Sequence, residues 1–126
     1  MNKYLLDTHV ALWWVESPER LDAHARRMIQ EPRHALWLSA ASLWEMAIKK
    51  SLGQLTYPGT LLSELRKDGI EILPVLAAHA LAVADLPHLH RDPFDRLLVA
   101  QAKIEGLTIV TRDEKVRAYG VPCLLG

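Results

Sequence analysis

Short apolar runs alternate with helical stretches along the whole chain, and this alternation limits the fold more than any other feature of the sequence. The strand-like runs are Tyr4–Leu6, Ala35–Leu38, Ile70–Pro74, Leu107–Thr111 and Val121–Leu124. The last of these is expected at a sheet edge, because Pro122 lacks a backbone donor. Strands that alternate with helices through short connections are typical of a parallel sheet covered by helices on both faces. The sequence therefore predicts an α/β fold.

Capping residues set the predicted helix boundaries. Ser17 is the expected N-cap of a helix with Pro18 in its first position, and Gly53 and Gly106 are expected just past the ends of two others. The predicted helices span His9–Glu16, Pro18 to about Gln30, Ala40–Leu52, Thr60–Lys67, Ala77–Asp85 and Pro93–Glu105, with a short turn at Asp113–Arg117.

Length and composition are those of one ordinary globular domain, predicted over residues 1–126. The single cysteine, Cys123, excludes an internal disulfide and favours a reducing compartment. Neither a signal-peptide core nor an apolar run of about 20 residues is present, so we expect a cytoplasmic protein with no membrane partner. Lys+Arg and Asp+Glu are equal at 15 each, which counts against a nucleic-acid binder unless an acidic cluster masks basic residues.

Two aspartates directly follow predicted strands. Asp7 comes after the first strand, and Asp113 lies just beyond the fourth. Because sites in parallel α/β sheets gather at the carboxyl ends of the strands, we expect these two side chains at the same edge.

Two further acids lie on the apolar sides of their helices. Asp95 shares a helix face with Leu98, Val99 and Ala102, and Glu45 shares one with Ala41, Ile48 and Leu52. Like charges at 4 Å repel by roughly 4 kcal/mol at an effective dielectric of 20, so four such acids in one place need a cation. All-oxygen ligands favour Mg²⁺ or Mn²⁺ over zinc.

Each acid also has a purely structural interpretation. Asp7 could cap the helix that follows it, and Asp113 could cap the short turn after it. Ser42 and Glu45 match a capping box, although Ser42 is expected inside its helix. Asp92 is the natural N-cap before Pro93, and Asp95 near that end complements the helix dipole.

Four segments of the chain together resemble the PIN-domain family, and most closely the VapC-type toxins of bacterial toxin–antitoxin pairs. They occur in the family's order across nearly the whole chain, and the third is the most specific. The segments are Leu5–His9, Ser42–Lys49, His90–Ala102 and Thr111–Asp113.

The resemblance implies a three-layer α/β/α sandwich with a mostly parallel sheet of four or five strands. It also implies a Mg²⁺-dependent ribonuclease, with Mn²⁺ as a possible substitute. The catalytic acids would be Asp7, Glu45, Asp95 and Asp113, of which Asp7 and Asp95 hold the metal. Asp92 matches an acidic position of this subgroup only. An RNA substrate, a cognate antitoxin and a homodimer are further expectations from the family.

The remaining polar residues near these segments are assigned to the substrate side of the site. We predict contacts from Arg96, Arg112, Lys49, Thr8 and Thr111, although Arg96 could instead pair with a carboxylate and the threonines could orient one. His88 and His90 are expected to be loop residues that support the site, and a zinc site using them with Asp92 is the weaker alternative. The tryptophans are core or interface residues, or they stack on RNA or a partner segment: Trp13, Trp14, Trp37 and Trp44.

Rival functions use the same residues differently. A non-catalytic binding domain would bind metal without turnover, and a DNA-directed nuclease would use the same chemistry. A response-regulator-like phosphoacceptor needs an aspartate at the end of a central strand and a lysine at the end of a later one. The third strand ends in Pro74 and Val75, which argues against that function.

Overall fold

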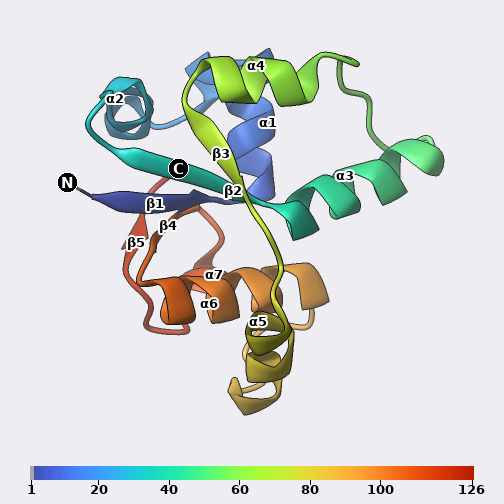
Figure 1. Cartoon of the computed structure of the whole chain (residues 1–126), viewed down its shortest axis with the longest axis vertical. Helices are drawn as coiled ribbons and strands as arrows, with labels where there is room; N and C mark the ends of the chain where they lie inside the picture. Colours follow the sequence, from blue (N-terminus) through green and yellow to red (C-terminus); the bar gives the residue numbers. More distant parts are fainter. Residues whose placement is uncertain (1) are drawn as a thin grey trace.

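A five-stranded parallel sheet forms the centre of the protein, which we describe from a computed structural model covering residues 2–126 (Figure 1). Met1 lies outside the described residues. The strand order is β3-β2-β1-β4-β5, with every neighbouring pair parallel. The strands are β1 (Lys3–Leu6), β2 (Ala35–Ser39), β3 (Ile70–Leu73), β4 (Thr108–Val110) and β5 (Cys123–Leu124).

The two faces of the sheet bury different cores. Side chains alternate along β1, so Tyr4 and Leu6 point to one face and Leu5 to the other. The first face packs against α1 (Thr8–Glu16), α2 (Ala23–Gln30) and α4 (Leu61–Lys67). The second packs against α6 (Pro93–Glu105) and α7 (Glu114–Arg117). Figure 1 shows these two helical layers above and below the sheet, which confirms the predicted α/β/α sandwich.

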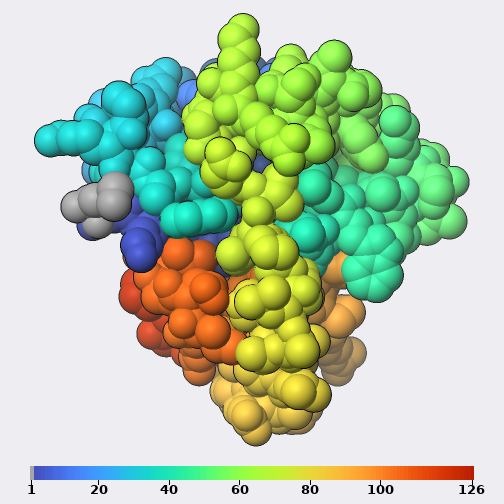
Figure 2. Space-filling view, in the orientation of Figure 1, coloured from blue at the N-terminus to red at the C-terminus, as the bar shows by residue number. Residues whose placement is uncertain are grey.

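The remaining elements join the layers. Helix α3 (Ala40–Ser51) leaves the end of β2 and contacts both α1 and α6. Helix α5 (Ala77–Ala82) continues into a 3₁₀ turn, η2 (Val83–Asp85), and packs beside α6. In the space-filling view this yellow segment runs down the front of the molecule next to the orange residues of α6 (Figure 2).

The prediction of one helix from Pro18 to Gln30 is wrong. The structure has a 3₁₀ turn, η1 (Pro18–Arg20), and then an extended Leu21 that is 4% exposed and packs into the core. The side chain of Ser17 makes no capping bond, whereas Asp22 accepts one from the backbone N–H of His24 at 3.0 Å. Burying Leu21 breaks the helix, and Asp22 is the cap that restarts it.

Other boundaries follow the predicted signals closely. Asp92 caps α6, Pro93 is its first residue, and Gly106 ends it in the left-handed conformation with φ of 68°. The predicted edge strand is present, although β5 holds only Cys123 and Leu124. Among residues 2–126, the helices are too short or too polar to cross a membrane.

Candidate active site

A pocket opens at the carboxyl edge of the sheet, where β1 and β4 end and where α3 and α6 begin. Its volume is about 360 Å³. All four predicted catalytic acids line it, together with Asp92. The lining residues are Asp7, His9, Val10, Trp13, Glu45, Lys49, Asp92, Asp95, Arg112 and Asp113, and we call this the acidic pocket.

Asp7 is fixed at the end of the central strand. It occupies the N-cap position of α1, but its side chain makes no capping bond, so capping does not explain it. Instead one carboxylate oxygen accepts a 2.6 Å hydrogen bond from the Thr111 hydroxyl, which lies just beyond β4. Burial raises the pKa of Asp7, and the Thr111 bond only partly offsets that.

Glu45 reaches the pocket from α3. The N-cap of α3 is Ser39, so Ser42 lies inside the helix and the capping-box alternative for Glu45 is wrong. One Glu45 oxygen accepts from the buried Thr8 hydroxyl at 3.1 Å, and the other lies 3.2 Å from the Lys49 ammonium. Glu45 is only 7% exposed, and a buried carboxylate is costly without partners. These two contacts provide a partner for each of its oxygens.

Asp95 carries the strongest electrostatic perturbation in the pocket. Burial, followed by the nearby negative charges of Asp7 and Asp92, raises the pKa of Asp95 to about 7. Asp92 itself accepts from the backbone N–H groups of Phe94 and Asp95, as the capping interpretation predicted. The first turn of α6 thus brings a carboxyl group to the other acids, where it resists ionisation unless a cation is bound.

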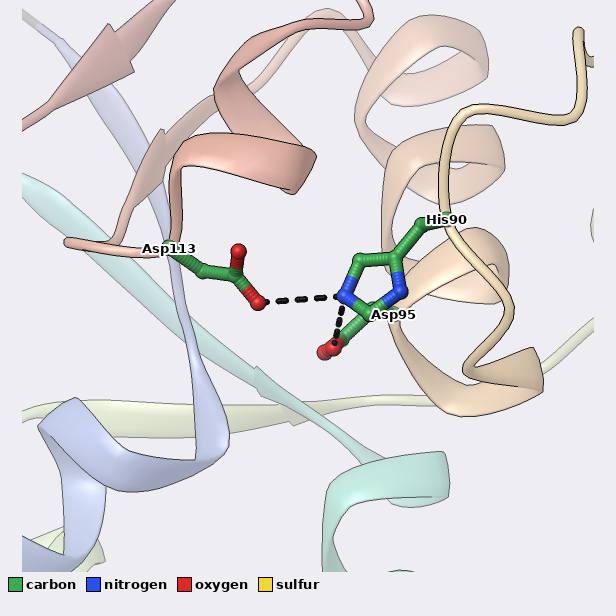
Figure 3. A group of neighbouring side chains, drawn as sticks. All are labelled: His90, Asp95 and Asp113. Atoms are coloured by element: carbon green, nitrogen blue, oxygen red, sulfur yellow. Dashed lines mark hydrogen bonds and ion pairs between the residues drawn. The ribbon is translucent and has the colours of Figure 1, made fainter.

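His90 links Asp95 and Asp113, two of the acids that line the pocket. Its Nε2 atom lies 3.0 Å from an Asp95 oxygen and 3.1 Å from an Asp113 oxygen. Figure 3 shows the ring between the two carboxylates, with a dashed line to each. Asp113 also caps α7 by accepting from the backbone N–H of Lys115. Burial would raise the pKa of Asp113, but the bonds from Lys115 and His90 outweigh it and lower that pKa.

The hydrogen bonds of His90 define which ring nitrogen carries the proton. The backbone N–H of Asp92 points at Nδ1 from 3.2 Å, and an N–H can only donate. Nδ1 is therefore the acceptor, and Nε2 carries a proton that is shared between Asp95 and Asp113. The ring thus places an N–H, and not a lone pair, between two acids.

This donor set fits a hard divalent cation. Carboxylate oxygens of Asp95 and Asp113 lie within 4.8 Å of each other, and carboxylates of Asp7 and Glu45 line the same pocket. Carboxylate oxygens suit Mg²⁺ or Mn²⁺, whereas the predicted zinc alternative needs a free imidazole nitrogen. His90 groups with Asp95 and Asp113 and not with His88, so the zinc grouping is not formed.

Arg96 does not reach the pocket. Adjacent helix residues point in different directions, and Arg96 is 8% exposed beneath the loop that precedes α6. Its guanidinium donates to the backbone oxygens of Val83 and Pro87 and to the Tyr119 hydroxyl. The expectations that it contacts the substrate or a carboxylate are both wrong. It stabilises the loop instead, and Tyr119 in turn accepts from the backbone N–H of His90.

The other predicted contact residues divide into two groups. Arg112 and Lys49 line the acidic pocket. Thr8 and Thr111 are 5% and 0% exposed and hold carboxylates, so they orient acids and have almost no surface for a substrate. Sequence reasoning did not assign His9 or Trp13 to the pocket. The placement of His90 between two acids depends on its tertiary contacts.

The family comparison agrees with this geometry. The model of the PIN domain family matches residues 4–122. The chain belongs to the PIN domain family. The chain is also similar to Ribonuclease VapC22 of Mycobacterium tuberculosis, with 34% identity, over 97% of this chain and 95% of that protein.

Solved structures show the same fold as this PIN domain. VapBC2 from Rickettsia felis, bound to a DNA fragment from their promoter, contains a chain that matches with a TM-score of 0.71 and 17% identity. That match covers 98% of this chain and 97% of the other. FitAcB from Neisseria gonorrhoeae matches with a TM-score of 0.66 and 25% identity, over 97% and 96% of the two chains.

Proposed function

We propose that this PIN domain is a divalent-cation-dependent ribonuclease that hydrolyses RNA phosphodiester bonds. The observation that supports this most is the convergence of Asp7, Glu45, Asp95 and Asp113 on one pocket, from two strand ends and two helices. Asp7 and Asp95 have raised pKa values there because both are buried. The 34% identical relative, which is a ribonuclease, supports the same activity.

In this proposal Asp7 and Asp95 hold Mg²⁺, with Mn²⁺ as a substitute, and Glu45 and Asp113 complete the site. A cation bound there would lower the pKa of an attacking water and neutralise charge that develops on the phosphate. The threonine hydroxyls fix the directions of the inner carboxylates, through Thr111 to Asp7 and Thr8 to Glu45.

The basic side chains in the pocket would bind the scissile strand. Lys49 lies beside Glu45 with its side chain 40% exposed, so its ammonium is available to a phosphate at the pocket mouth. Arg112 is exposed and lines the same pocket. The positive side chains of Lys49 and Arg112 are concentrated at the pocket, so a chain with zero net charge can still bind a polyanionic substrate there.

The biological role that we propose is the toxin of a type II toxin–antitoxin system. The resemblance to VapC toxins and the fold shared with VapBC complexes support a cognate antitoxin as partner. A homodimer, a single domain spanning the chain and a cytoplasmic location belong to the same proposal.

Incubation of purified protein with total RNA, with and without Mg²⁺, tests the activity. New RNA ends should form only with the cation, and they should be lost with Asp95→Asn. Metal binding without any turnover would support a non-catalytic binding domain. Cleavage of single- or double-stranded DNA in parallel reactions, with RNA left intact, would show that the protein is a DNA-directed nuclease that uses the same chemistry.

A further inference from the structure

A second cavity lies next to the acidic pocket, beside helix α1. It has a volume of about 250 Å³ and lies between α1, α3 and the loop that follows α3. His9, Trp13 and Lys49 line both this cavity and the acidic pocket. The two spaces therefore adjoin at these three side chains. We call the second space the α1–α3 cavity and the two spaces together the track.

Two guanidinium groups stand at the junction of the track. The guanidinium carbons of Arg20 and Arg112 lie 4.8 Å and 4.7 Å from the centroid of the Trp13 ring. Arg112 is further fixed because its Nη2 donates to the backbone oxygen of Arg20 at 2.8 Å and to Gly126 at 2.7 Å. Cation–π contacts with Trp13 thus keep two guanidinium groups next to the acidic pocket.

The α1–α3 cavity has the chemistry of a site for a planar, edge-polar group. Leu12, Met46 and Leu55 give it apolar walls, and Gln54 gives it an amide that both donates and accepts. Glu16 and Lys49 are its charged residues of opposite sign, together with Arg20 at the junction. Apolar walls with a few polar groups at the rim are typical of small-ligand sites.

We infer that the track binds the nucleotide next to the scissile phosphate, an inference that rests on the proposed function. The flanking phosphate lies on Arg20 and Arg112, and its base enters the α1–α3 cavity. The RNA phosphates would contact the guanidinium groups of Arg20 and Arg112 on one side and a metal ion held by the acids on the other. The base would pack against the apolar walls of the cavity and form a hydrogen bond with the Gln54 amide.

Helix α1 offers a built-in spectroscopic control. Trp13 faces the track, whereas the neighbouring Trp14 donates its indole N–H to Asp68 at 3.0 Å, away from it. The chain carrying Asp95→Asn, which should not cut RNA, is titrated with a single-stranded RNA tetranucleotide. The indole N–H signal of Trp13, assigned with Trp13→Phe, should shift, and the signal of Trp14 should not.

A charge variant tests the phosphate contact in the same uncut complex. Arg20→Gln should weaken binding of the tetranucleotide about tenfold and lower the slope of log K against log salt by about 0.7, the value for one phosphate on a single strand. The matched control is Arg27→Gln, an exposed arginine on α2 that lines neither space. A purely structural effect of Arg20 would not change the salt slope.

The outcomes separate this inference from the nuclease proposal. If RNA is cleaved by the unaltered chain, yet Trp13 does not shift and Arg20→Gln binds normally, the track is not the RNA path while the nuclease stands. If an acidic peptide moves the Trp13 signal and RNA does not, the track belongs to a partner segment and the inference is overturned. Absence of both cleavage and RNA binding would overturn both proposals.

Discussion

The two halves of the acidic pocket are held in different ways. The inner pair, Asp7 and Glu45, is 7% exposed at each residue, and a buried threonine hydroxyl bonds each acid. The outer pair, Asp95 and Asp113, has side chains 15% and 35% exposed, and both share one N–H from His90. The inner acids are thus fixed by the core, whereas the outer acids are held together by a ring on a loop.

This difference separates two tasks of a metal site. Fixed ligands define where a cation sits, and adjustable ones allow it to enter and leave. The inner pair depends on packing that forms with the fold itself. The outer pair depends on a hydrogen bond that a cation must replace, since His90 directs a proton at the oxygens that would bind it. The following predictions test that division, in order of decreasing effect.

Asp95→Asn should give the largest loss. The amide keeps the shape of the side chain but removes the charge that would bind the cation, so Mg²⁺-dependent RNA cleavage should fall by about a thousandfold. Cleavage rates measured alongside a circular dichroism spectrum separate lost chemistry from lost fold. Full activity in this variant would remove the proposed mechanism.

Thr111→Val should have the next largest effect, because it disturbs the inner pair without touching a charge. Asp7 would lose its 2.6 Å donor, and the backbone N–H of Asp113 would lose its acceptor. Activity or metal affinity should fall about 10- to 100-fold, as for other groups that orient a ligand. Thr108→Val, the same change at the first residue of β4, where no bond to a pocket acid is formed, is the matched control. Equal activities for the two variants would show that the hydroxyl is dispensable.

His90→Ala should act in the opposite direction on metal binding. Removing the N–H frees the outer pair, so Mn²⁺ or Mg²⁺ measured by titration calorimetry should bind about fivefold more tightly, equivalent to one ordinary hydrogen bond. His88→Ala, an exposed neighbour on the same loop, should bind metal unchanged. Weaker binding by the His90 variant would mean that the ring supports the cation and does not compete with it.

The smallest effect concerns stability without metal. The folded pKa of Asp95 is about 7, above its ordinary 3.8, so between about pH 4 and pH 7 the folded chain keeps a proton that the unfolded chain has released. Stability contributed by this group therefore falls as pH rises through that window. At pH 8, Asp95→Asn should melt at least about 5 °C higher than the unaltered metal-free chain, and this gain should shrink at pH 4. A lower melting temperature at pH 8 would indicate a structural ion pair at Asp95.

Sequence reasoning succeeded where local pattern determines the structure. The strand–helix alternation predicted the parallel sandwich, and Asp92, Pro93 and Gly106 bounded α6 because capping depends on near neighbours. It failed at Ser17, where two suitable caps, Ser17 and Asp22, compete and the burial of Leu21 decides between them. That burial is a tertiary effect which no local window contains.

The candidate site shows the same limit. Strand direction predicted that Asp7 and Asp113 share one edge of the sheet, whereas the convergence of all four acids was expected only from the resemblance to the PIN-domain family. Arg96 was misplaced because proximity to Asp95 in sequence does not give a shared direction on a helix. The position of His90 between two acids was not predicted, because its loop is placed by Tyr119, which lies 29 residues away in the sequence.

The bond between Thr111 and Asp7 spans 104 residues, and it has a consequence for synthesis. Residue 7 is synthesised well before the hydroxyl that orients it and before the acid at position 113. Parallel pairing of β4 with β1 is equally non-local, so it cannot form until β4 has been synthesised. A nascent or truncated chain that lacks these last segments therefore carries the acid at position 7 without an assembled centre.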